Sequence, residues 1–118
     1  MREPIRDKSR LEHILESINY ILEFTSGIDF EDFSINKMLQ FAVVKNLEII
    51  GEACYKLTND IKSKYSEIEW GKIISMRHIL VHGYYDTDEM IVWNTIKELI
   101  IFKEQIQTIY NNEKLIQS

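Results

Sequence analysis

The segment MRHILVHGYY, residues 76–85, contains the residues of this chain whose types and spacing best suit chemistry. Arg77 offers a planar fork of donors to phosphate oxygens, and two of the chain's three histidines, His78 and His82, can exchange protons near neutral pH. No carboxylate occurs in residues 72–85, although acidic residues flank this window on both sides. A cation beside a histidine in a locally positive window indicates acid–base chemistry on a phosphate substrate.

Two further interpretations of these histidines stay open from the residues alone. His78 and His82 lie four residues apart, about 40° around an ideal helix, which suits two ligands of one metal ion. A closed metal site needs three or four ligands, however, and His13 is the only other histidine, so we expect no metal and no cofactor. Alternatively, residues 79–81 pack within a core helix, and the histidines beside them have only a structural role.

The spacing of Arg77 and His82 raises a geometric question. On an ideal helix, two positions five residues apart lie about 140° around the axis, so they do not share a face. Gly83 lets a helix end directly after His82, which could turn the imidazole toward the arginine. Alternatively, two chains each supply part of the site. The pair therefore predicts a site at a helix end or at a subunit interface.

Stripes of apolar residues at helical spacing predict the elements that must position this segment. Ser9 and Glu12 form a capping-box pattern, so we expect a first helix from about Arg10 to Ser26 that is stopped by Gly27. Its apolar face consists of Leu11, Ile14, Leu15, Ile18, Ile21 and Leu22.

A second long helix is expected to begin after Asn36, which can cap it, and to run to about Thr58. The connector before it, residues 28–35, has room for one helical turn. Gly51 lies inside the second helix and indicates a close crossing with another helix. The apolar stripe consists of Leu39, Val43, Leu47, Ile50, Cys54 and Leu57.

A third main helix is predicted from Trp70 to Gly83, and Asp86–Glu89 offer an acidic start to a fourth that continues toward the C-terminus. Between the second and third helices, Ile61 and Tyr65 are the expected anchors of a polar segment. The apolar face of the fourth helix is predicted to consist of Ile91, Val92, Ile96, Leu99, Ile100, Ile106 and Tyr110.

Composition narrows the fold class and the partners. The 118 residues fit one domain, and four glycines and one proline leave few helix breakers, so residues 1–118 are expected to form an all-α, antiparallel bundle of four to five helices. A formal net charge of −5 excludes a global basic field, so any contact with nucleic acid must be local. The single cysteine, Cys54, is expected to be buried and unreactive. Neither a signal peptide nor a membrane span is recognisable, so we expect a cytoplasmic protein.

The string from Arg77 to Tyr84 is similar to the R-x4-H-x-Y motif of the HepT-like family, within the wider HEPN superfamily. The sequence NLEIIGEA, residues 46–53, resembles the family's long central helix, and residues 70–93 resemble its motif helix and the entry to the last helix. The resemblance covers most of the chain, about residues 10–106. It implies a helical bundle that dimerises and places two copies of the motif in a shared cleft.

The resemblance also implies a role for each motif residue. HepT-like proteins are toxins of bacterial and archaeal toxin–antitoxin pairs, and many HEPN proteins are metal-independent RNases. A minimal, MntA-like nucleotidyltransferase neutralises the toxin by adding AMP to the motif tyrosine. Carried over, His82 is the general acid and base, Arg77 binds phosphate and stabilises the transition state, and Tyr84 accepts AMP. We therefore expect a homodimeric endoribonuclease toxin that acts on RNA and binds this antitoxin, also in larger hetero-oligomers.

The chain departs from the family's pattern beside the arginine, where His78 replaces a residue that is often smaller and polar. His78 could therefore assist His82, and Tyr85 could accept AMP in place of its neighbour Tyr84. Messenger and transfer RNA are both open as substrates. The main alternative is a non-catalytic helical module that docks a nucleotidyltransferase. Three lysines could extend the basic window toward an RNA: Lys56, Lys62 and Lys64.

Overall fold

The computed structural model describes the backbone of residues 2–83 and 88–117 and the side chains of residues 6–77 and 88–113. Within these ranges every regular element is a helix, which confirms the predicted all-α class. The helices are α1 (Arg2–Phe24), α2 (Phe30–Ser34), α3 (Lys37–Lys56), α4 (Asn59–Lys64), α5 (Trp70–Gly83) and α6 (Glu89–Gln117). None of the described helices is both long enough and apolar enough to cross a membrane.

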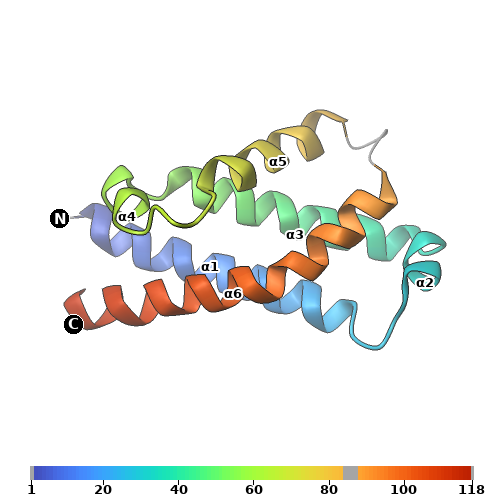
Figure 1. Ribbon diagram of the computed structural model, residues 1–118, viewed down its shortest axis with the longest axis horizontal. Helices are drawn as coiled ribbons and strands as arrows, with labels where there is room; N and C mark the ends of the chain where they lie inside the picture. The colour runs from blue at the N-terminus through green and yellow to red at the C-terminus, as the bar shows by residue number, and fades with distance from the viewer. Residues whose placement is uncertain (1, 84–87, 118) are drawn as a thin grey trace.

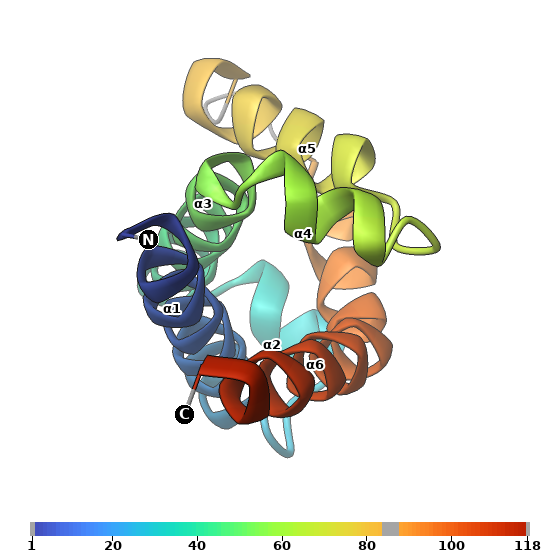
Figure 2. The ribbon, with the colours of Figure 1, turned by 90° about the vertical axis from the view of Figure 1, so that its left-hand side faces the viewer.

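Each of the four long helices, α1, α3, α5 and α6, runs antiparallel to the long helix before it in the chain (Figure 1). Helix α3 packs against both α1 and α5, and α1 also packs against α6, so the order across the bundle is α5, α3, α1, α6. Seen along the bundle, these helices curve around a common interior, with the short helices α4 and α2 at its two ends (Figure 2). The predicted antiparallel bundle with extra turns is confirmed.

The core forms where the predicted apolar stripes of α1 and α3 meet. Because residues three and four apart share a helix face, each stripe presents one continuous apolar surface to its neighbour. Burial raises the pKa of the Cys54 thiol to about 12, so this thiol stays protonated at neutral pH, as expected of an unreactive cysteine. Fully buried side chains of the two helices are Leu11, Ile14, Ile18, Ile21, Val43, Leu47, Ile50 and Cys54.

Polar caps and one glycine set the helix ends on either side of α2. The Asn36 side chain accepts a hydrogen bond from the backbone N–H of Leu39 at 3.0 Å, which confirms Asn36 as the cap of α3. Gly27 follows α1 with a φ of +75°, a left-handed conformation that a side chain disfavours, so it acts as the predicted stop. Asp29 and Asp32 form a capping box for α2 that the sequence analysis did not predict.

The capping box predicted at Ser9 and Glu12 is wrong, because α1 begins at Arg2 and both residues lie within the helix. The segment before them is held by a tertiary contact that no local pattern reveals. The buried carboxylate of Asp7 accepts hydrogen bonds from the backbone N–H and the hydroxyl of Thr58, at 2.9 and 2.6 Å. This contact ties the first turns of α1 to the start of α4, so the helix extends earlier than predicted.

The Asp7 contact gives a first prediction. We expect Asp7→Asn to lower the free energy of unfolding by about 1 kcal/mol, because hydrogen bonds to a charged acceptor contribute more than those to a neutral amide. Urea denaturation at fixed protein concentration measures this change. Glu16→Gln, an exposed carboxylate on the same helix, is the matched control. Equal stability of both variants would show that Asp7 does not hold α1 in place.

The predicted core face of α6 is wrong at two positions. Ile91 and Ile100 are 61% and 57% exposed, whereas Phe102 and Ile109, which were not predicted, are buried. Helix α6 packs mainly on α1, so only one stripe of its surface is covered. The buried stripe has regular spacings of three and four residues and consists of Val92, Ile96, Leu99, Phe102, Ile106 and Ile109.

Candidate active site

Arg77 is positioned by the close crossing of α5 over α3. Gly51 of α3 lies directly beneath it, because a Cβ atom added at Gly51 would lie 2.2 Å from Arg77 Cβ and 2.9 Å from its Cγ. Only glycine leaves room for this approach, which confirms the close helix crossing predicted at Gly51. The backbone of α3 therefore fixes the base of the Arg77 side chain.

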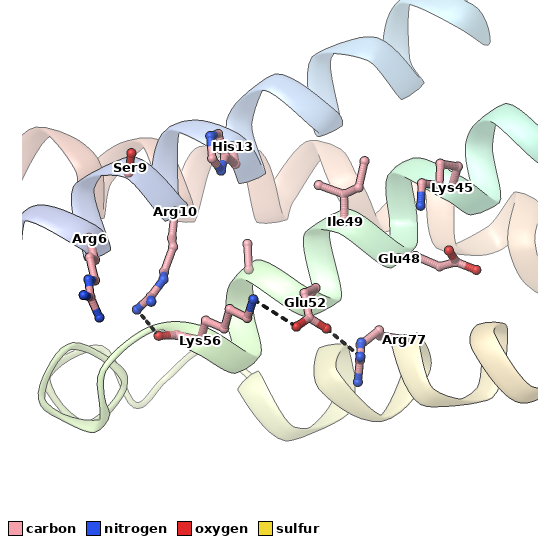
Figure 3. A pocket seen from close by; sticks show the side chains of 11 residues that line it. Arg6, Ser9, Arg10, His13, Lys45, Glu48, Ile49, Glu52, Lys56 and Arg77 are labelled. Carbon is pink, nitrogen blue, oxygen red and sulfur yellow. Dashed lines mark hydrogen bonds and ion pairs between the residues drawn. The ribbon is translucent and has the colours of Figure 1, made fainter. Parts of the chain in front are cut away.

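The guanidinium end of the Arg77 side chain is held by a carboxylate of α3, the helix that also contains Gly51. Glu52 Oε2 lies 2.5 Å from Arg77 Nη2, and Glu52 Oε1 lies 3.4 Å from the Lys56 ammonium one turn later (Figure 3). The Arg77 side chain keeps 32% of its surface exposed. An arginine has five N–H donors in a fixed fork, so the pairing with Glu52 orients the guanidinium and leaves other donors for a phosphate.

Arg77 lies at the edge of an open groove of about 510 Å³ between α1, α3 and α5 (Figure 3). Helix α1 contributes Arg6, Ser9, Arg10 and His13, and Ile49 and Ala53 of α3 supply apolar surface. Five cationic side chains face two carboxylates, Glu48 and Glu52, so the groove is locally positive although the whole chain carries a net charge of −5. The cations are Arg6, Arg10, Lys45, Lys56 and Arg77.

One lining residue of the groove, Arg10, also connects two helices of the fold. Arg10 Nη1 donates to the backbone carbonyl of Lys56 at the end of α3, and the same guanidinium lies 3.8 Å from Asp7. A cation at a helix C-terminus satisfies an otherwise unpaired carbonyl and interacts favourably with the helix dipole. Arg10 therefore holds α1 against α3 and contributes positive charge to the groove at the same time.

The source of the positive charge differs from the prediction. Among the described side chains of the basic window, residues 72–77, Arg77 lines the groove, whereas Lys72 lies 3.7 Å from Glu98 on α6. Of the three lysines that could have extended it, Lys56 lines the groove, and Lys62 and Lys64 do not. Lys62 donates to the carbonyls of Cys54 and Tyr55 at the end of α3, and Lys64 pairs with Glu113 at 3.0 Å. The groove's other cations come from α1 and α3.

The other predicted site residues fall outside the described side chains. The backbone of α5 is helical through Gly83, the last described residue of this segment, and the side chains of His78 and His82 lie outside the described part. Tyr84 and Tyr85 lie outside the described residues altogether. The structure therefore gives the place of Arg77 and of the helix positions that carry the two histidines.

Sequence reasoning missed Glu52 and the α1 side of the groove. The α1 side of the groove does have a signal in the sequence. Arg6, Arg10 and His13 follow the helical spacing of four and three residues and share one face with Ser9. Starting the first helix at Arg10 hid this face. Glu52 and Lys56 likewise have the spacing of an ion pair on one helix turn.

Among the residues whose side chains are described, no three potential metal-ligating side chains lie close enough together to hold an ion. The described lining of the groove contains five cations and two carboxylates, so cations outnumber anions there. An excess of cations favours anion binding, and the arginine fork matches the geometry of phosphate and carboxylate oxygens.

Comparison with known proteins adds an independent line of information. A family model described as "Ribonuclease HepT-like" matches residues 14–109. The chain is 47% identical over 91 residues to "Probable ribonuclease HepT" of Thermococcus cleftensis, covering 77% of this chain and 83% of that protein. It is 42% identical over 91 residues to a "Putative RNase" of Methanocaldococcus jannaschii, covering 77% of this chain and 84% of the relative. A "Putative RNase" of Caldanaerobacter subterraneus subsp. tengcongensis is 40% identical over 105 residues, 88% of this chain and 94% of that protein. No solved structure matches the chain significantly.

Proposed function

The chain belongs to the HepT-like ribonuclease family, and on this premise we propose that it is a metal-independent endoribonuclease whose site contains Arg77 and His82. One observation carries the proposal. Arg77, the first residue of the R-x4-H-x-Y string, is seated on Gly51, oriented by Glu52 and exposed at the edge of a positive groove. That placement suits a residue that binds a phosphate during RNA cleavage.

The proposed reaction uses the nucleophile that RNA itself carries. A histidine removes the proton of a ribose 2′-OH, the 2′-oxygen attacks the neighbouring phosphorus, and the bond from phosphorus to the 5′-oxygen breaks. A proton delivered to the leaving 5′-oxygen completes the step and leaves a 2′,3′-cyclic phosphate. Arg77 stabilises the additional negative charge on the phosphorane. In this proposal His82 performs the proton transfers, and His78 could assist.

The regular helix of α5 favours a site shared by two chains. Because α5 stays helical through Gly83, the positions of Arg77 and His82 are about 140° apart around the same helix. We propose a homodimer in which the arginine of one chain approaches the histidine of the other. Two copies of His82 would then supply a base and an acid in one cleft.

The proposed biological role is that of the toxin in a toxin–antitoxin pair in the cytoplasm. A minimal nucleotidyltransferase would neutralise the enzyme by adding AMP to Tyr84. The added phosphate and base would repel and block the substrate phosphate at the site. Incubation with such a nucleotidyltransferase and ATP, followed by intact mass and peptide mapping, tests this role. Tyr84→Phe should abolish the mass increase and Tyr85→Phe should not, and the reverse would move the acceptor by one residue.

The ribonuclease proposal is tested by cleavage of total cellular RNA in the presence of EDTA. Cleavage that persists in EDTA and leaves 2′,3′-cyclic phosphate ends is the expected result. Cleavage that EDTA abolishes, or that leaves 5′-phosphate ends, would contradict the metal-free mechanism. If purified protein of unmodified intact mass does not cleave at all, the non-catalytic module that docks a nucleotidyltransferase becomes the better account.

The Glu52–Arg77 pair gives a second prediction. We expect Glu52→Gln to lower kcat roughly tenfold without raising KM, since a displacement of about 1 Å in a positioning group can cost roughly 100-fold in rate. Binding should not weaken, because one negative charge leaves the groove. Glu48→Gln removes the same charge one turn earlier and should share the effect on KM but not the fall in kcat. Equal kinetics of the two variants would show that Glu52 does not position Arg77.

A further inference from the structure

We propose that the groove between α1 and α3 binds the single RNA strand that flanks the scissile phosphate, with Arg6 and Lys45 as phosphate contacts remote from Arg77. This inference rests on the proposed ribonuclease function and extends it to a surface that the R-x4-H-x-Y string does not include. The two side chains lie toward opposite ends of the groove, and Arg77 lies beside it on α5 (Figure 3).

The distribution of charge favours a polyanion as the occupant. The chain as a whole is acidic, with a net charge of −5, yet five cations from three separate helices line this one groove. One of its two carboxylates, Glu52, already pairs with Arg77 and Lys56. Polyanion binding is driven by phosphate neutralisation, and it requires such a local concentration of cations when the overall field is unfavourable.

The length of the groove favours more than one phosphate. Lys45 and Lys56 both line it and lie eleven residues apart on α3, a separation of roughly 16 Å along the helix axis. Arg6 and Arg10 line the facing side from successive turns of α1. Cations spread over this length suit several phosphates of one strand, whereas a single phosphate would need only Arg77.

The floor of the groove favours a single strand over a duplex. Ile49 is 37% exposed and lies between Lys45 and Lys56 along α3, so it offers apolar surface to a ribose or an unpaired base. Single strands bind by this combination of a positive groove with apolar contacts to the bases.

The experiment measures binding without cleavage. In a His82→Ala background and in EDTA, fluorescence anisotropy reports the affinity for a labelled 12-nucleotide oligouridylate, which has no stable secondary structure. Losing one phosphate contact should lower affinity about fivefold at 0.1 M monovalent salt and reduce the slope of log K against log[salt] by about 0.7. Arg6→Gln and Lys45→Gln should each show this loss, and the double variant should lose about 25-fold.

The matched control is the double variant Lys97→Gln/Lys103→Gln, which removes two charges from α6 outside the groove. Thermal unfolding of each variant verifies that the fold is retained. An equal loss of affinity in the control would show that net charge alone matters, and this would overturn the proposal. So would unchanged RNA binding by the Arg6→Gln/Lys45→Gln variant.

Two further outcomes separate this inference from its premise. If the protein with His82 intact does not cleave RNA but oligouridylate binding depends on Arg6 and Lys45, the groove stands and the ribonuclease function fails. If cleavage occurs and the double variant binds normally, the groove inference fails alone. A 12-residue oligoglutamate that binds as tightly as the RNA, with the same dependence on Arg6 and Lys45, would indicate an acidic protein partner and overturn the choice of RNA.

Discussion

Replacing His82 with alanine is expected to lower kcat/KM for RNA cleavage by about 10²–10⁴-fold, the usual contribution of a positioned acid or base. The residual rate would come from phosphate binding and from charge stabilisation by Arg77. In the proposed dimer each cleft contains two copies of the motif, so one substitution removes both the base and the acid. The two limbs of the pH–rate profile that report the base and the acid should both be lost from the residual rate.

The matched control for this prediction is His78→Ala, which removes an imidazole one helical turn earlier. A loss for His78→Ala below about tenfold would assign the proton transfers to His82, since a general acid or base is expected to contribute about 10²-fold or more. Similar losses for both variants would show that the two histidines share this work. Unfolding midpoints must match that of the unsubstituted protein for either comparison to hold. If His82→Ala retains cleavage within about threefold, the acid–base role falls well short of the usual contribution and is contradicted.

The sequence predicted those parts of the fold that depend on local patterns. The stripe through Val43, Leu47 and Cys54 identifies the buried face of α3, and Gly51 identifies its crossing, because a helix-interior glycine without a packing reason is costly. The start of α1 could not be predicted in the same way. The pattern at Ser9 is a valid local signal, but the contact between Asp7 and Thr58 joins residues 51 positions apart and overrides it.

The exposed residues of α6 also show that a local sequence pattern does not reveal which residues a tertiary contact buries. Ile91 and Ile100 fit an apolar helix face as well as their buried neighbours do, and only the docking of α6 on α1 decides which face is covered. In the candidate site, too, the contiguous motif can be predicted from the sequence, whereas residues brought together by the tertiary fold cannot. The string that begins at Arg77 is contiguous and recognisable. Its partner Glu52 and the groove cations of α1 lie on other helices, so their convergence follows from the tertiary fold.

The crossing at Gly51 leads to the prediction with the largest expected effect on stability. A Cβ at this position would lie 2.2 Å from Arg77 Cβ and 3.3 Å from its Cα. Those atoms are fixed by the backbone of α5, so no side-chain rotation relieves the overlap and the whole helix must move. Overpacking of this kind costs about 1–3 kcal/mol, and the higher helix propensity of alanine returns at most about 1 kcal/mol.

We therefore expect Gly51→Ala to lower the free energy of unfolding by about 1–2 kcal/mol and Gly51→Leu to lower it by about 3 kcal/mol or more. Urea denaturation at fixed protein concentration measures both. Cleavage should fall in the same order, because moving α5 separates Arg77 from Glu52.

Gly71 of α5 provides the matched control, since a Cβ there would meet nothing within 4 Å. Gly71→Ala should leave stability unchanged or raise it by up to about 1 kcal/mol, because the same exchange then changes only chain entropy and helix propensity. Equal stability of Gly51→Ala and Gly71→Ala would mean that α5 does not rest on α3 at Gly51. The seating of Arg77, and with it the observation on which the ribonuclease proposal rests, would then have to be abandoned.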